Sequence, residues 1–192
     1  EVFILVVSRG KKGMFSDEKI DNVRREARNA HEVLGVSETR FLNYEAPELD
    51  LVSISDLSGS ISGIINVFKP ATMFLPHRGD IHHDHRAVFN AGLVASRPVN
   101  GNSVRRIFCY ETLSETEWAP PFGDDAFIPD YFVNITMFFE YKLDAMNCYK
   151  SQLKSFPNPR SLKAIEALAN LRGSTVGFKF AEAFMTIRVI ED

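Results

Sequence analysis

The feature that most restricts the fold is a continuous apolar run near the start of the chain. Val2–Val7 shows no alternation of polar and apolar side chains and is rich in β-branched residues. Such a run is typical of a strand that is buried on both faces of a parallel sheet. Parallel neighbours must be joined by crossover connections, which are usually helices. The run therefore predicts a fold in which strands alternate with helices.

The rest of the chain shows this alternation. Apolar residues recur every three or four positions in some segments, whereas others are short, apolar and bounded by turn residues. The predicted helices span 17–34, 55–68, 84–95, 138–151 and 161–171, and Ser16 and Ser55 are the predicted caps of the first two. The further predicted strands span 39–42, 71–75, 104–110, 132–135 and 181–189, and the last is expected at a sheet edge. This order predicts an α/β fold with a three-layer, doubly wound, mostly parallel and Rossmann-like sheet.

Length and composition limit the classes of protein. A chain of 192 residues is expected to form one domain, and a net charge of −3 offers no basic surface for nucleic acid. No apolar run approaches the roughly 20 residues of a membrane span, and we expect a cytoplasmic protein. Cys109 and Cys148 form no CxxC pair, so we interpret them as buried thiols. The chain also lacks a glycine-rich phosphate loop.

The densest group of ionisable side chains follows the predicted strand 71–75. Four of the five histidines and two carboxylates lie within residues 75–86. A neutral imidazole is the commonest metal ligand, and its second nitrogen is usually held by a carboxylate or a carbonyl. His82, Asp84 and His85 supply both kinds of group. Because open α/β sheets bind ligands beyond the carboxyl ends of their strands, we interpret this run as a functional site rather than a solvated polar loop.

The segment 111–130 is a second candidate for function. It is a long loop after a predicted strand, and loops of this length are usually functional or mobile. It holds the only tryptophan, Trp118. This side chain either offers a flat apolar face to a sugar ring or anchors the loop on the core. Arg86 and Asp80 are interpreted as rim or loop-shaping residues, with Arg86 as a candidate substrate contact, and Glu182 as one half of a salt bridge.

Asp80-Ile81-His82-His83-Asp84-His85-Arg86 resembles the second zinc motif of the PIG-L/LmbE-like de-N-acetylases. That motif is an Asp, then a His two residues on, then an Asp-His pair, with Pro common where this chain has His83. Shorter similarities to the family occur, in order, at 25–36, at 68–70, at Tyr110-Glu111 with Thr116-Glu117-Trp118, at Lys142, at 151–152 and at 172–184. The resemblance therefore covers nearly the whole chain.

The resemblance implies a metal-dependent hydrolase that removes an N-acetyl group from an N-acetylglucosamine-type or related small amide. His85 would be the third ligand of Zn²⁺, with Fe²⁺ as another option. His82 would face the substrate, and Asp84 would orient the imidazole of His82. The expected partner is a small amino sugar, a homo-oligomer is left open, and nucleic acid and a membrane span are not expected.

One part of the family pattern is not found in the 192 residues. The first motif, Ala-His-Pro-Asp-Asp-Glu, supplies two metal ligands and the general base in the family, and we expect it before residue 1, because Glu1–Gly10 resembles the family's second strand. The expectation is thus one catalytic domain over 1–192, truncated at its N-terminus and lacking its first strand. The alternative is a non-catalytic or carbohydrate-binding homologue that lost this motif.

Overall fold

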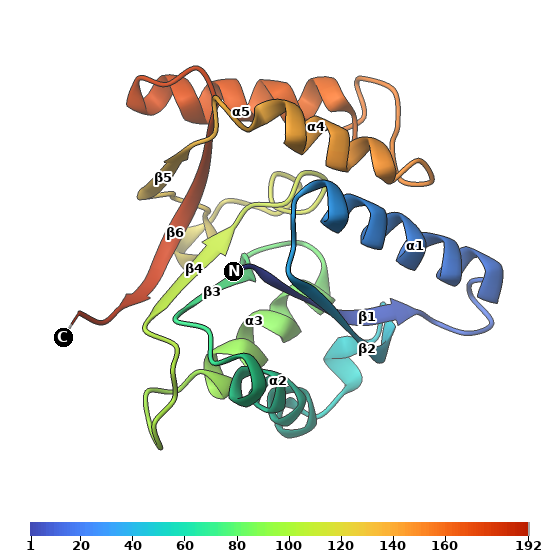
Figure 1. The fold of residues 1–192 in the computed structure, drawn as a ribbon, viewed down its shortest axis with the longest axis vertical. Coiled ribbons are helices and arrows are strands. Elements are labelled where there is room, and N and C mark those ends of the chain that lie inside the picture. Colours follow the sequence, from blue (N-terminus) through green and yellow to red (C-terminus); the bar gives the residue numbers. More distant parts are fainter. Residues whose placement is uncertain (192) are drawn as a thin grey trace. The chain divides into compact units, whose positions relative to one another are not determined.

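The computed structural model describes residues 1–191, and these form two compact units. Unit 1 comprises Glu1–Pro47 and Phe132–Glu182, and unit 2 comprises Glu48–Tyr131 with the chain from Ala183 on. Strands alternate with helices through both units, which confirms the predicted α/β class (Figure 1). The expectation of one catalytic domain over 1–192 stays a prediction.

Unit 1 contains a two-stranded parallel sheet. Its elements are β1 (Phe3–Gly10), α1 (Asp17–Val33), β2 (Glu38–Ala46), α4 (Phe139–Cys148), α5 (Leu162–Val176) and parts of β5 (Tyr131–Asn134) and β6 (Ala181–Val189). Strand β1 pairs with β2 from Phe3 opposite Glu38 to Gly10 opposite Ala46. Every residue of β1 is half-buried, so the predicted burial on both faces is not observed.

Local signals explain where the helices of unit 1 begin. The Ser16 hydroxyl accepts the backbone N–H of Lys19 at 3.2 Å, which confirms the predicted cap of α1. Asp17 and Glu18 in the first turn complement the helix dipole. Helix α5 begins at the Ser161 cap and ends at Gly177, which has a φ of 80° that a residue with a Cβ rarely adopts.

A core cluster of unit 1 lies between α4, α5 and the residues just before β6. Phe139 and Phe180 stack with ring centroids 3.8 Å apart, and Ile135 and Ala169 are buried beside them. Aromatic stacking adds to the free energy gained from burial. This core therefore ties α4 to the start of β6.

Unit 2 contains the remaining elements. They are η1 (Leu49–Leu51), α2 (Ile54–Phe68), β3 (Thr72–Pro76), α3 (His83–Ala95), β4 (Arg106–Tyr110), η2 (Gly123–Asp125) and most of β6. Helices α2 and α3 lie side by side, and α3 packs on β3 (Figure 1). The packing on β3 is close at Gly92, where a Cβ would lie 2.6 Å from a methyl carbon of Leu75.

The larger sheet has the strand order β3-β4-β6-β5. Strands β3 and β4 are parallel, whereas β4 and β6 are antiparallel. Backbone bonds from Asp130 to Phe184 and from Ile135 to Phe180 show that β5 also runs opposite to β6. The predicted single, mostly parallel sheet is thus not what residues 1–191 form, and β6 lies inside its sheet rather than at the predicted edge. A buried strand is apolar whether it runs parallel or antiparallel to its neighbours. The apolar pattern of β6 therefore could not predict the direction of this strand.

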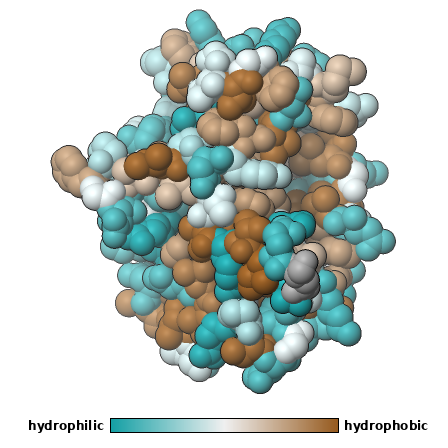
Figure 2. Space-filling model, turned by 90° about the vertical axis from the view of Figure 1, so that its left-hand side faces the viewer, coloured by the Kyte–Doolittle hydropathy of each residue, from teal (hydrophilic) through white to brown (hydrophobic). Residues whose placement is uncertain are grey.

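The thiols and the surface complete the description. Cys109 is buried, Cys148 is half-buried, and both are free. Among the described residues, no helix has the length and apolar character needed to cross a membrane. Apolar residues also reach the surface, where Figure 2 shows brown groups among the teal. Leu51 in unit 2 is 77% exposed and Met137 in unit 1 is 83% exposed. Apolar side chains are thus available for contacts outside the core.

Candidate active site

The histidine run connects β3 to α3 within unit 2. The strand ends at Pro76, and the chain turns back so that His82 becomes the N-cap of α3. The Nδ1 atom of His82 accepts the backbone N–H of Asp84 at 3.2 Å. Since an imidazole nitrogen that accepts carries no proton, the neutral ring of His82 has its proton on Nε2. His82 therefore offers a hydrogen-bond donor at the helix start.

His85 has the opposite arrangement. Its Nδ1–H donates to Oδ2 of Asp80 at 2.7 Å, and Asp80 has no exposed surface. The lone pair of His85 thus lies on Nε2. A carboxylate behind an imidazole is the usual support of a metal-ligating histidine, because it fixes the tautomer and the ring direction. Asp80 is therefore the residue that orients a histidine, a role that the sequence analysis did not assign to it.

The two rings are neighbours. They stack with centroids 5.2 Å apart and an angle of 14° between their planes. His82 thus presents a proton on Nε2 beside His85, which presents a lone pair on Nε2. One ring can donate a hydrogen bond to an oxygen while the other binds a metal ion or accepts a proton.

Asp84 does not make the predicted contact with the ring of His82. Its carboxylate Oδ1 accepts the backbone N–H of Leu49 at 3.0 Å, and only its backbone N–H reaches His82. The Oδ2 atom is buried and has no hydrogen-bond partner among the described residues. A buried oxygen in this state costs free energy unless a donor or a cation satisfies it.

Arg86 shapes the histidine loop. Its Nε–H donates to the carbonyl of Asp80 at 2.6 Å, and Nη2 donates to the carbonyl of Gly79 at 3.3 Å. The guanidinium keeps further donors. The structure supports the loop-shaping interpretation, and the predicted substrate contact of Arg86 stays a prediction.

The segment 111–130 is attached to the histidine loop through the residues that follow β3. His77 is buried after β3, and its Nε2–H donates to the carbonyl of Asp125 at 2.8 Å. Arg78 pairs with Asp125 at 3.4 Å. A Cβ on Gly79 would lie 2.1 Å from the carbonyl oxygen of Asp125, so only glycine fits there. On this loop Trp118 is 57% exposed, which agrees better with a presented ring than with an anchor in the core.

Cys109 is not a nucleophile at this site. Burial, together with the negative charge of Asp80, raises the pKa of its thiol to about 12. A thiol with such a pKa stays protonated at neutral pH, and the thiolate is the reactive form. Cys109 is thus a core residue of β4.

The side chains fit a metal site in kind but not in number. His85 has the carboxylate support of a metal ligand, and Asp84 has an unsatisfied buried oxygen. However, no group of three or more His, Cys, Asp or Glu side chains in residues 1–191 could hold an ion. A catalytic zinc normally has three protein ligands. The described residues thus supply part of such a site.

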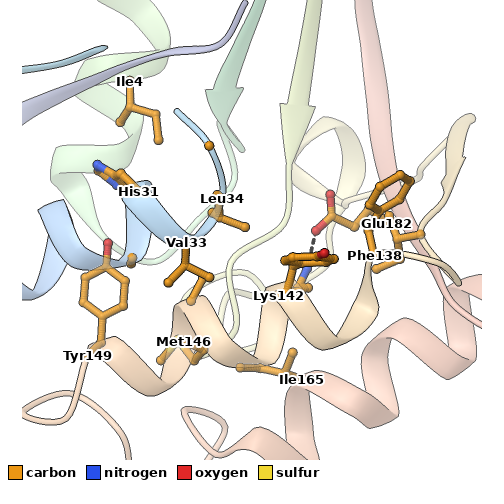
Figure 3. A pocket seen from close by; sticks show the side chains of 15 residues that line it. Ile4, His31, Val33, Leu34, Phe138, Lys142, Met146, Tyr149, Ile165 and Glu182 are labelled. Atoms are coloured by element: carbon orange, nitrogen blue, oxygen red, sulfur yellow. Dashed lines mark hydrogen bonds and ion pairs between the residues drawn. The ribbon is translucent and has the colours of Figure 1, made fainter. Parts of the chain in front are cut away.

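A cavity of about 740 Å³ lies in unit 1. Figure 3 shows Val33 of α1, Leu34 at the C-cap of α1 and Met146 of α4 around it. Glu182 accepts from Lys142, which confirms its interpretation as half of a salt bridge. His31 is buried: its Nδ1 bonds the Thr39 hydroxyl at 2.9 Å, and burial lowers the pKa of its ring. The cavity lining is mostly apolar, and the charges of Lys142 and Glu182 neutralise each other. We therefore assign no chemistry to this cavity.

The chain is similar to known proteins in sequence and in fold. The sequence model of the family described as "PIG-L: GlcNAc-PI de-N-acetylase" matches residues 1–96, which include the whole histidine run. The chain belongs to this family. A relative in Escherichia coli, "Uncharacterized deacetylase YaiS", is 30% identical over 77% of this chain and 74% of its own length. The family and its relatives point to a deacetylase.

Two further proteins that are similar to this chain have more specific names. The "Probable N-acetyl-alpha-D-glucosaminyl L-malate deacetylase 2" of Bacillus cereus is 24% identical over 93% of this chain and 78% of its own. The N,N'-diacetylchitobiose deacetylase from Pyrococcus horikoshii has a similar fold, with a TM-score of 0.74, 22% identity and coverage of 98% of this chain and 73% of its own. At that identity the structural similarity establishes the fold alone.

Proposed function

We propose that this chain hydrolyses the N-acetyl group of an amino sugar of the N-acetylglucosamine type. The observation that carries the proposal is the stacked pair His82 and His85, which presents a donor beside a lone pair on the family's motif. The names of the Bacillus and Pyrococcus relatives support an amino-sugar substrate. The exposed ring of Trp118 would supply an apolar face for the sugar.

Amide hydrolysis needs an attacking water, a donor for the carbonyl oxygen and a proton for the leaving amine. His82 Nε2–H would donate to the oxygen as negative charge develops on it in the tetrahedral intermediate. His85 would be one ligand of a divalent metal, Zn²⁺ or Fe²⁺, with its direction fixed by Asp80. Such an ion supplies Lewis acidity, which polarises the carbonyl and activates water. Besides the two histidines, Asp84 is a polar side chain of this site whose buried oxygen has no partner among the described residues.

A second candidate function is carbohydrate binding without catalysis. The observation that favours it is that residues 1–191 contain no group of three metal-ligating side chains. The two functions differ in whether acetate is released.

The test measures acetate and free amine from N-acetylglucosamine and from N,N'-diacetylchitobiose, with added Zn²⁺ or Fe²⁺ and with a chelator. We expect release that depends on the metal and is lost in His85→Ala. His83→Ala is the matched control, because His83 is an exposed neighbour without an assigned role. Sugar binding without any acetate release would favour the second candidate, and equal turnover by His85→Ala would contradict the role of His85.

A further inference from the structure

The buried carboxylate of Asp80 depends on donors from two segments. It has no exposed surface, so its oxygens rely on donors from the protein. Its Oδ2 accepts Nδ1–H of His85 at 2.7 Å, and its Oδ1 accepts the hydroxyl of Thr116 at 2.6 Å. His85 belongs to α3, whereas Thr116 belongs to the turn 112–119 after β4. One carboxylate thus joins this turn to the ring of His85.

The hydroxyl of Thr116 has a fixed direction. Its oxygen accepts the backbone N–H of Thr112 at 2.8 Å, which leaves its own hydrogen for Asp80. A backbone bond from Ile81 N–H to the carbonyl of Glu115, at 3.1 Å, holds the same turn against the histidine loop. The order of donors is therefore set from the turn inward: Thr112 to Thr116, and Thr116 to Asp80.

We propose that Thr116 is a positioning residue for His85. By holding Oδ1 of Asp80, it keeps Oδ2 in place to fix the tautomer and direction of the His85 ring, so the turn 112–119 controls the lone pair on Nε2. The catalytic part of this inference rests on the proposed function. The tautomer part does not, because it follows from the hydrogen bonds alone.

The test compares Thr116→Val, which keeps the shape and removes the hydroxyl, with Thr116→Ser, which keeps the hydroxyl. In ¹⁵N-histidine-labelled protein in alkaline buffer, where imidazole rings are neutral, we expect the wild-type His85 ring to show a protonated Nδ1 and a bare Nε2. Thr116→Val should give an averaged pair of ring shifts, and Thr116→Ser should restore the wild-type pair. On an N-acetyl amino sugar, Thr116→Val should lower kcat by roughly 10–100-fold, the usual effect of losing such support, with KM little changed.

Glu117→Ala is the matched control. The carboxylate of Glu117 accepts the backbone N–H of Ser114 at 2.6 Å, so its loss loosens the same turn without touching Asp80. We expect Glu117→Ala to keep the wild-type shifts of His85. If it reproduces the effect of Thr116→Val, Thr116 merely holds the turn, and the proposal is wrong. The proposal is equally wrong if Thr116→Val keeps the wild-type His85 shifts.

Asp80→Asn provides an independent check that does not depend on the folding of Thr116→Val. An amide that keeps the Thr116 bond at its oxygen directs its NH₂ group at His85, whose Nδ1 must then accept. The tautomer of His85 should therefore reverse to a protonated Nε2, and an unreversed tautomer would overturn the proposal. If wild-type protein releases no acetate, the proposed function fails, and the ring shifts still decide the role of Thr116.

Discussion

Two histidines three positions apart differ at the residue scale because of their partners. His82 accepts a backbone N–H at Nδ1, whereas His85 donates from Nδ1 to a buried carboxylate. The first is committed to donating from Nε2, and the second keeps a lone pair there. Substitution of either ring should therefore remove a different step of the proposed reaction.

His82→Ala is expected to retain the metal affinity of wild-type protein and to lose about 10²–10⁴-fold in turnover, the usual contribution of one acid–base or oxyanion group. Metal content and acetate release are measured on the same sample. Since His82 also caps α3, His82→Asn is the control that keeps a cap and lacks Nε2–H. If His82→Ala loses the metal as His85→Ala does, His82 is itself a ligand.

Trp118→Ala tests whether this side chain supplies an apolar face for the sugar. Because the ring is 57% exposed, its removal should leave the melting temperature nearly unchanged and raise KM or alter substrate preference. A melting curve and a substrate titration distinguish the two roles of this side chain. A loss of stability of about 3 kcal/mol or more, with unchanged KM, would mean that Trp118 anchors the loop.

The sequence predicted the location of the site better than its connections. The spacing of His82, Asp84 and His85 identified the loop, but it suggested Asp84 as the partner of an imidazole, where the structure has Asp80 bonded to His85. Thr116 lies 36 residues from Asp80, and its hydroxyl arrives only through folding. Partners of that kind leave no local pattern in a sequence.

At the element scale, the existence of helices and strands was predicted more reliably than their ends. The strand 181–189 has the predicted bounds, whereas α2 is capped by Ser53 rather than Ser55. Ser53 and Ser55 are both chemically suitable caps, so residue type could not select between them. Helix α5 continues to Val176, five residues beyond the predicted end at 171, because Gly177 rather than Gly173 ends it.

A buried carboxylate joins helix α1 to the turn that follows α4. Glu26 accepts the backbone N–H of Ser151 at 3.0 Å, its hydroxyl at 2.6 Å, and the side chain of Asn22 at 3.1 Å. Burial alone would raise the pKa of Glu26, but the bonds from Ser151 and Asn22 outweigh it, so the pKa is lowered. The carboxylate therefore stabilises unit 1 above the ordinary glutamate pKa, and this contribution is lost as the pH falls through the lowered pKa.

Glu26→Gln should reduce the free energy of unfolding at neutral pH by about 1.5–3 kcal/mol, the range for hydrogen bonds to charged groups. The deficit should shrink as the pH is lowered, because acid protonates the wild-type carboxylate as well. Urea unfolding at several pH values measures both effects. Glu32→Gln, on the exposed face of the same helix, is the control and should change little. A deficit that is independent of pH would contradict the ionic role of Glu26.

At the scale of the whole molecule, the alternation of elements was sufficient for the α/β class and insufficient for the sheet. The parallel pairs β1–β2 and β3–β4 agree with the prediction, and the neighbours of β6 do not. Strand order and direction depend on which segments meet after long connections. The hydrophobic pattern of a strand indicates that the strand is buried, but it does not indicate which strand it pairs with.

Zinc binding depends on the complete set of protein ligands. Since residues 1–191 offer no group of three ligands, the 192-residue chain should hold less than one equivalent of zinc after equilibrium dialysis. The measurement is metal analysis beside His85→Ala, which should hold less still. Stoichiometric zinc on the wild-type chain, unchanged in His85→Ala, would place the metal elsewhere.

His82 both caps α3 and carries a hydrogen-bond donor at Nε2. This has a consequence for relatives that have another residue at this position. Ser, Thr, Asp or Asn there would preserve the helix start, so folding would exert no selection against the change. A family member carrying one of them should be as stable as its relatives and unable to use this donor. The residue at this position would thus distinguish homologues that keep the fold but lack the proposed donor.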